Sequence, residues 1–529
     1  MSLSAHAAAG MILGGVGGLS PDAPDGEFAD MLAAYAKAGI KSFLFSGNLA
    51  RNPERLSPLV QAVRLKTEEA GLGRALVAIG GDASPGFGLP FFPEIPTPLG
   101  IASLESILAA KRAGYYAGSR LAACGIDMVL GPRLDLASDP KDPAGALEGF
   151  GEDARVAGLL GSAYARGLAR AGVGACVGRF PGLGAICRDC YEGMAFIALP
   201  VERLERCEMR PFARAAAIGV SAMLVGRVLV PSLESEHLPA SMSARVIEGR
   251  LREELGFRGL VIGDDIGPGE DPGRAAILGA LAGCDLCLFS RPDDACVAAA
   301  ALEKAMSEGE LPYIRVETSR RRFGQFGRSR SAPGSDVLPR LARRYARRYA
   351  AMLRRAARDV EKGICRLRGT LRLEAAERGE FDSVLVILFL PPDDAPDASE
   401  SEAVLSSIKA ELPDAEILTF PASPKPEHTE SLALVLAAPG RFTEAVILTY
   451  DAHFRPAQEG LAKLVEESLP RFRVIAMRDP YDAAFFPRAV GLGAAYGFSE
   501  ACARAVARVL SGKAPARGGQ PVEVIGLEV

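Results

Sequence analysis

The chain has 529 residues, too many for one hydrophobic core, so we expect at least two domains. Hydrophobic residues make up 49% and charged residues 24%, as in ordinary globular proteins, and the net charge of −4 argues against a nucleic-acid-binding protein. The cysteines are too sparse for a disulfide scaffold. The first residues lack the basic and apolar pattern of a leader, and the chain has no long apolar segment, so we expect a cytoplasmic protein without a membrane span.

Short apolar runs alternate with segments of helical periodicity through the first 320 residues. The apolar runs lie at residues 11–13, 42–45, 75–79, 128–130, 175–177, 222–225, 260–262 and 284–289, and the helical segments at 28–38, 58–70, 104–124, 154–171, 211–218 and 244–255. Eight strands alternating with helices over this length predict a parallel (β/α)8 barrel of the TIM type. A doubly wound open sheet is the alternative, but no Gly-x-Gly-x-x-Gly turn follows the first strand.

The composition changes after the eighth strand. Residues 315–328 are strongly basic, and residues 340–358 have the pattern of a helix rich in Arg and Ala. Acidic segments surround them, so a solvated helix face or an interdomain clamp is favoured over a nucleic-acid site. Further apolar runs lie at residues 382–390, 415–420, 444–450 and 473–478, with helical segments at 402–412, 457–468 and 500–511, and they predict a smaller α/β domain. We therefore predict a barrel domain at 1–325, a basic linker and helix at 326–375, and the smaller domain at 376–529.

Charged residues follow four of the predicted barrel strands. They are Asp135 after strand four, Arg179, Asp189 and Glu192 after strand five, Arg227 after strand six, and Asp264 and Asp265 after strand seven. Active sites of (β/α)8 barrels form at the carboxyl ends of the strands, so these residues are predicted to gather on one rim. Carboxylates and guanidinium groups together suit a polar ligand. The alternative is a ring of salt bridges that closes the barrel.

Two Cys-x-x-Cys pairs, at 187/190 and 284/287, have a spacing that can bind zinc. The second pair falls in an apolar strand, where residues three apart face opposite sides. This disfavours a shared metal ion, and we predict neither a metal nor another cofactor.

Several motifs occur in order along nearly the whole chain. They are Phe-Gly-Glu-Asp at 150–153, Arg-Phe-Pro-Gly-Leu-Gly at 179–184, Leu-Pro-Ala-Ser-Met-Ser at 238–243, the stretch 251–265, Arg-Asp-Pro-Tyr-Asp-Ala-Ala-Phe at 478–485 and Tyr-Gly-Phe-Ser-Glu at 496–500. With these motifs the chain resembles family 3 of the glycoside hydrolases, nearest its bacterial β-N-acetylglucosaminidase (β-hexosaminidase) branch. The resemblance implies a TIM-type barrel followed by a smaller α/β sandwich domain.

The resemblance also assigns catalytic roles. It implies that Asp264, the first acid after strand seven, is the nucleophile of a retaining mechanism. The acid/base of that branch is a His in an Asp-x-His loop after strand five, where this chain reads Asp189-Cys190-Tyr191. We expect Glu192 or Asp189 to serve instead, because burial can raise a carboxyl pKa toward neutrality, whereas a phenol needs much stronger tuning.

Sugar-binding positions of the family differ as well. The family's Lys-His before Phe-Pro-Gly is Gly-Arg here, its Asp-Gln-Glu-Gly-Gly after strand three is Gly-Gly-Asp-Ala-Ser at 80–84, and its His after strand six is Arg. The predicted substrate-binding residues are Asp135, Arg179, Arg227, Asp265 and Asp82. The two arginines either favour an anionic sugar or neutralise the neighbouring acids.

Two functions follow as expectations. The first is a β-N-acetylhexosaminidase-like glycosidase that acts on a small carbohydrate. The alternative is a degenerate member of the family that binds a carbohydrate or an anionic small ligand without hydrolysis.

Overall fold

A computed structural model describes residues 6–16, 25–46, 53–80, 95–141, 145–186, 194–266, 269–328, 351–352, 354–378, 381, 383–395, 397–438 and 440–524. The chain forms two compact units. The first comprises Met1–Phe92, Ala110–Asp139 and Asp153–Arg348, and the second Pro93–Ala109, Pro140–Glu152 and Tyr349–Val529. The second unit thus includes two short segments from the barrel part of the sequence, which the linear division at residues 325 and 376 does not contain.

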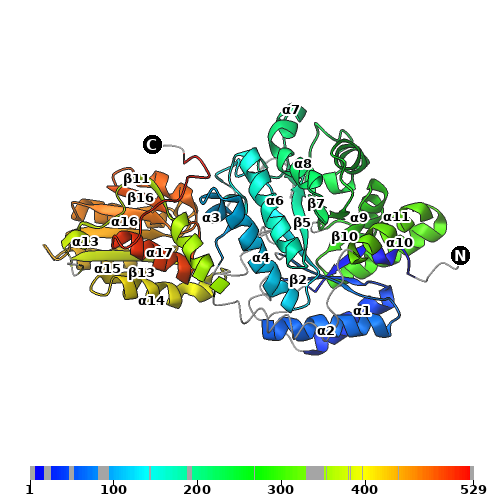
Figure 1. The fold of residues 1–529 in the computed structure, drawn as a ribbon, viewed down its shortest axis with the longest axis horizontal. Helices are drawn as coiled ribbons and strands as arrows, with labels where there is room; N and C mark the ends of the chain where they lie inside the picture. Colours follow the sequence, from blue (N-terminus) through cyan, green and yellow to red (C-terminus); the bar gives the residue numbers. More distant parts are fainter. Residues whose placement is uncertain are drawn as a thin grey trace. The chain divides into compact units, whose positions relative to one another are not determined.

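Eight parallel strands close into a barrel in the first unit (Figure 1). They are β1 (Ile12–Gly15), β2 (Ser42–Ser46), β3 (Leu76–Gly80), β4 (Met128–Arg133), β5 (Gly174–Phe180), β7 (Ala222–Val225), β9 (Leu260–Gly263) and β10 (Leu286–Phe289). Each strand pairs with its neighbour in sequence, and β1 pairs with β10 to complete the ring. The predicted (β/α)8 barrel is therefore confirmed, and the open sheet is excluded.

Helices alternate with the barrel strands. They are α1 (Asp25–Ala38), α2 (Pro53–Glu69), α4 (Ile107–Ala123), α6 (Ala154–Arg170), α8 (Arg210–Ala217), the π-helical η5 (Arg245–Glu254), α9 (Pro272–Ala282), α10 (Pro292–Glu308) and α11 (Tyr313–Arg328). Shorter elements are η1 (Ala9–Met11), β6 (Ala195–Phe196), α7 (Val201–Arg203), the π-helical η3 (Leu204–Glu208), β8 (Val228–Leu229) and η4 (Ala240–Met242). Within the described part of the chain, none of the helices combines the length and apolarity that crossing a bilayer requires.

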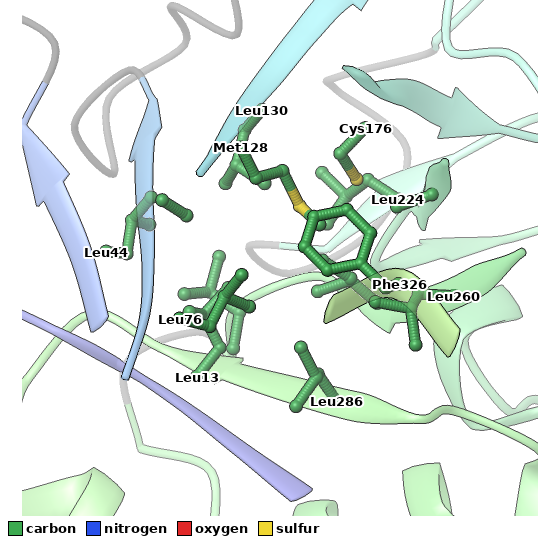
Figure 2. Packing of buried hydrophobic residues seen from close by; sticks show 14 residues of the cluster. Leu13, Leu44, Leu76, Met128, Leu130, Cys176, Leu224, Leu260, Leu286 and Phe326 are labelled. Carbon is green, nitrogen blue, oxygen red and sulfur yellow. The ribbon is translucent and has the colours of Figure 1, made fainter. Parts of the chain in front are cut away.

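The barrel interior is filled by apolar side chains, as Figure 2 shows. Residues two apart on a strand point to the same face, so pairs such as Leu76 with Ala78 and Leu260 with Ile262 both face inward. The ring of Phe326 lies among them. This residue comes from α11 and stands one position beyond the predicted domain boundary at residue 325.

The helix α11 is anchored at the amino ends of the strands. Asp285, directly before β10, is fully buried and accepts hydrogen bonds from Arg252 (2.7 Å), Arg322 (3.0 Å) and Ser319 (3.1 Å). Its Oδ2 also accepts the backbone N–H of Val261 in β9 at 3.0 Å. The basic segment 315–328 was predicted to be a solvated face or an interdomain clamp, and part of it instead binds an acid of the barrel.

The second unit is built on one six-stranded sheet of order β11-β16-β15-β14-β12-β13. Its strands are β11 (Cys365–Gly369), β12 (Val384–Leu390), β13 (Glu416–Pro421), β14 (Glu444–Thr449), β15 (Phe472–Ala476) and β16 (Gly491–Ala494). All pairs are parallel except β11 with β16. The predicted smaller α/β domain is confirmed, but β11 and β16 were not predicted, and β11 lies inside the predicted linker at 326–375.

Helices cover both faces of this sheet. They are α14 (Ser401–Glu411), α15 (Pro426–Leu436), α16 (Ala457–Ser468) and α17 (Glu500–Leu510). The second unit also contains the short elements α3 (Pro98–Ala102), α5 (Gly145–Glu148), α13 (Glu374–Arg378), η6 (Ala398–Glu400), η7 (Ala452–Phe454) and η8 (Pro480–Phe485). The helix α14 packs on α17, and α15 packs on α16. Along the sheet, the chain passes from β12 to β13 in one direction and from β13 to β14 and then β15 in the opposite direction. Because crossovers between parallel strands are right-handed, the two helix pairs lie on opposite faces of the sheet. The predicted helix at 340–358 lies mostly outside the described residues.

The motif at 478–485 supplies a buried network at the carboxyl edge of this sheet. Arg478 donates to the Tyr450 hydroxyl at 2.6 Å and to Asp451 at 3.0 Å, and Tyr450 donates to Asp397 at 2.6 Å. Burial raises the pKa of Asp451 to about 6, although the neighbouring Arg478 opposes the shift. Because the positive charge of Arg478 is balanced by the neighbouring carboxylates, we interpret the network as one that stabilises the second unit.

Candidate active site

Asp264 directly follows β9, at the carboxyl end of the barrel. Its backbone N–H donates to Val225 O at 3.0 Å, which ties it to the end of β7. The side chain is 17% exposed, and its Oδ2 lies 3.1 Å from Nε of Arg179, which belongs to β5. Its Oδ1 accepts the backbone N–H of Asp265 at 3.0 Å. The carboxylate is therefore held in one orientation and keeps contact with solvent.

Asp265 is engaged by the next strand. Its Oδ1 accepts the backbone N–H groups of Ser290 at 3.1 Å and of Ile266 at 3.0 Å. Burial raises the pKa of Asp265, while hydrogen bonds from Ser290 counteract the shift and the charge of Asp264 adds to it. Asp265 thus links the loops that follow β9 and β10.

Arg227 lies close to both acids and is ion-paired with Glu270 of the same rim. Burial lowers the pKa of Arg227, whereas the charges of Asp264 and Asp265 raise it. Each rim arginine thus has a carboxylate partner: Asp264 for Arg179 and Glu270 for Arg227.

Asp135 is turned into the protein. It is 1% exposed, its Oδ2 accepts Nε of Arg133 at 2.7 Å, and its Oδ1 accepts the backbone N–H groups of Arg179 at 3.2 Å and Leu183 at 2.9 Å. The predicted substrate-binding role of Asp135 stays a prediction. The contacts join Asp135 to the loop that carries Arg179.

Glu208 is a second buried acid below the same loop. The Ser138 hydroxyl donates to its Oε1 at 3.2 Å, and its Oε2 makes no hydrogen bond within the described residues. Burial raises the pKa of Glu208 to about 7, and the charge of Asp135 adds to the effect of burial, while Ser138 and Arg203 oppose it. The sequence did not single out this residue, because an acid ahead of an amphipathic helix has the pattern of an ordinary surface charge.

The raised pKa of Glu208 predicts a pH-dependent stability. The folded state binds this proton more tightly than the unfolded state, so the contribution is complete below about pH 4.5 and is lost as the pH rises through about 7. We expect Glu208→Gln to remove this loss and to raise the free energy of unfolding at pH 8 by roughly 3 kcal/mol relative to wild type. Urea unfolding at pH 5 and pH 8 measures it, with the exposed Glu202→Gln of α7 as control. Equal pH dependence in Glu208→Gln and wild type would contradict the assignment.

The predicted site residues Asp82, Asp189 and Glu192 lie outside the described residues. Tyr191 lies outside them as well. Their predicted roles stay predictions. The Cys187/Cys190 pair lies there too. In the described part of the chain, Cys284 donates to Ser241 O at 3.3 Å, and no group of His, Cys, Asp and Glu side chains is arranged to hold a metal ion.

The structure brings Arg179, Arg227, Asp264 and Asp265 together on one rim. Sequence reasoning missed Glu270 and Ser290, the partners of Arg227 and Asp265. Glu270 stands six residues after Asp264 in the same loop, which could have indicated it. Ser290 acts through its backbone and its side chain, and it follows the eighth strand in the same way as Asp264 follows the seventh.

Comparison with known proteins shows which sequences and folds the chain is similar to. The sequence model described as the Glycosyl hydrolase family 3 N terminal domain matches residues 12–325. The β-hexosaminidase of Bordetella pertussis is 33% identical over 258 residues, which are 47% of this chain and 69% of that protein. The β-hexosaminidase of Xylella fastidiosa is 34% identical over 197 residues, which are 36% of this chain and 57% of that protein. A family 3 β-N-acetylglucosaminidase structure from a Paenibacillus species covers both chains completely, with a TM-score of 0.84 and 24% identity.

Proposed function

Because the chain belongs to glycoside hydrolase family 3, we propose that it is a retaining β-N-acetylhexosaminidase-like glycosidase with Asp264 as the nucleophile. The observation that carries the proposal is the position of Asp264. It is a partly exposed carboxylate at the carboxyl end of a barrel strand, held by Arg179 at 3.1 Å. The β-hexosaminidase relatives support the sugar class.

The reaction runs in two steps. Asp264 forms a bond to the anomeric carbon as the bond from that carbon to the leaving oxygen breaks, and the leaving oxygen takes a proton. A water molecule then attacks the same carbon, the ester to Asp264 breaks, and the configuration is retained. We propose Glu192 or Asp189 as the group that gives the proton in the first step and takes one from water in the second. The contact with Arg179 and the N–H of Asp265 orients the nucleophile for both steps.

The test is trapping of the glycosyl-enzyme. The full-length protein is incubated with a panel of activated 2-fluoro glycosides, and its intact mass is measured. A covalent adduct that maps to Asp264 after proteolysis supports the proposal. The absence of an adduct on a protein that hydrolyses an activated β-N-acetylhexosaminide, or an adduct on another residue, would overturn it.

The alternative is a degenerate member that binds a carbohydrate without hydrolysis. It is favoured by Tyr191, which stands where the resemblance expects the acid/base His. Such a protein forms no adduct and releases no aglycone from any of the activated glycosides, but calorimetry detects binding of a sugar.

The ligand is proposed to be a small carbohydrate, and the two rim arginines allow an anionic one. If they bind an anionic sugar, Arg179→Ala and Arg227→Ala should each weaken a uronic acid or a muramic-type sugar by about 1.5–3 kcal/mol without affecting N-acetylglucosamine. The ion pairs with Asp264 and Glu270 favour the opposite result, in which both sugars are affected alike. Isothermal calorimetry measures the affinity of each variant for the two sugars and so distinguishes the two results. Glu270→Gln, which removes the carboxylate partner of Arg227, serves as a matched variant.

A further inference from the structure

The Asp135 carboxylate joins two loops at the carboxyl end of the barrel. The backbone donors Arg179 and Leu183 lie 44 and 48 residues further along the chain than the acid that binds them. The side chain is buried, with 1% of its surface exposed. Among the described residues, it accepts hydrogen bonds from Arg133, Arg179 and Leu183.

Residues 179–183 form a tight turn with Asp135 at both of its ends. Within the turn, the Gly182 N–H donates to Arg179 O at 2.8 Å. Gly182 has a φ of +115°, a conformation that favours glycine. The turn is also tied to its neighbours, because Leu134 N–H donates to Gly178 O at 2.7 Å. The backbone at residue 179 is therefore fixed from several sides.

The fixed backbone determines where the Arg179 guanidinium lies. Phe180 O accepts the Gly226 N–H at 2.8 Å, and Val225 O accepts the Asp264 N–H at 3.0 Å. The segment that carries Arg179 and the segment that carries Asp264 are therefore both hydrogen-bonded to the end of β7. On this frame, Arg179 reaches Asp264 at 3.1 Å. We propose that Asp135 is a positioning residue: it fixes the turn through which Arg179 holds Asp264 in the orientation for attack. This rests on the proposed function, because it requires Asp264 to be the attacking group.

The variants are Asp135→Asn, Arg179→Gln and the double variant. Asn has the same shape as Asp, but whichever way its amide is turned, its NH₂ group meets either Arg133 or the two backbone N–H groups, which are all donors. The control is Asp127→Asn at the amino end of the same strand, β4. Asp127 likewise accepts a backbone N–H, from Val77 at 3.0 Å, and an arginine, Arg74 at 2.7 Å.

The measurements are the rate constant for adduct formation with one 2-fluoro glycoside, kcat and KM for an activated aryl glycoside, and the melting temperature. We expect Asp135→Asn and Arg179→Gln each to slow adduct formation by about 10- to 100-fold, the effect of a small misplacement, with little change in KM. The double variant should be no slower than the slower single variant, because both changes act on one path. Asp127→Asn should lower the melting temperature but keep the wild-type rate.

Three results would overturn the inference. They are additive losses of rate in the double variant, a wild-type rate of adduct formation in Arg179→Gln, and equal losses of rate in Asp135→Asn and Asp127→Asn. If Asp135→Asn does not fold, Gly182→Ala disturbs the turn without changing the acid, and a wild-type rate in that variant overturns it as well. A wild-type protein that forms no adduct overturns the proposed function, and the inference with it. A wild-type protein that reacts, with variants that do not slow, overturns the inference alone.

Discussion

Asp264→Asn should slow release of the aglycone from an activated β-N-acetylglucosaminide by roughly 10⁴- to 10⁶-fold, as expected when a nucleophile is removed. The amide cannot form the ester, and its NH₂ group would face a donor at either position, the Arg179 Nε or the Asp265 N–H. Because the side chain is partly exposed, the melting temperature should change little. Steady-state kinetics and thermal unfolding measure the two effects.

Two comparisons make the Asp264 result specific. Asp271→Asn lies in the same loop and caps α9, where Asn serves as well as Asp, so that variant should keep full activity. Asp264→Ala in the presence of azide should regain turnover and release a glycosyl azide of inverted configuration, since azide then takes the place of the carboxylate. Activity of Asp264→Asn close to that of wild type would show that another group attacks.

Asp285→Ala should lower the free energy of unfolding of the barrel by about 3–5 kcal/mol, because it leaves the buried Arg252 without its carboxylate. It also removes the acceptor of Val261 N–H, Ser319 and Arg322, so β9 and α11 lose their common anchor. Urea unfolding gives the free energy. Hydrogen exchange of peptides that cover β9 and β10 locates the loss in the first unit.

Asp127→Ala is the matched control for Asp285→Ala. It also removes an acid that directly precedes a barrel strand, but its partners Arg64 and Arg74 are partly exposed. Its ion pairs should therefore be worth only about 1 kcal/mol or less. If the two variants lost the same free energy, burial of Asp285 would not be the reason for its importance.

The strands of the barrel could be predicted because their signal is local. A parallel strand covered on both faces is a continuous apolar run, and such runs mark β9 and β10 as clearly as β4. The same physics placed Asp264. A carboxylate that directly follows a buried strand must leave the core, and in this fold it leaves at the carboxyl rim.

Two strands of the second unit lacked such a signal. The sequence of β11 is Cys-Arg-Leu-Arg-Gly, with only alternate residues buried, and that of β16 is Gly-Leu-Gly-Ala. Neither forms a long apolar run. They become strands because they pair with each other, and because β16 also pairs with β15. The pairing of β11 with β16 joins segments more than one hundred residues apart.

By itself, the sequence determined the alternating strands and helices and the rim to which Asp264, Arg179 and Arg227 belong, because burial and period are properties of short segments. Only the tertiary structure decided what these side chains contact. It paired Arg227 with Glu270 and turned Asp135 away from solvent toward Arg179 and Leu183. It also gathered three arginines on Asp285, which are Arg252, Arg315 and Arg322. The reason is physical: a charged side chain takes the partner that closure of the barrel brings within hydrogen-bonding distance, and that partner comes from a distant part of the chain.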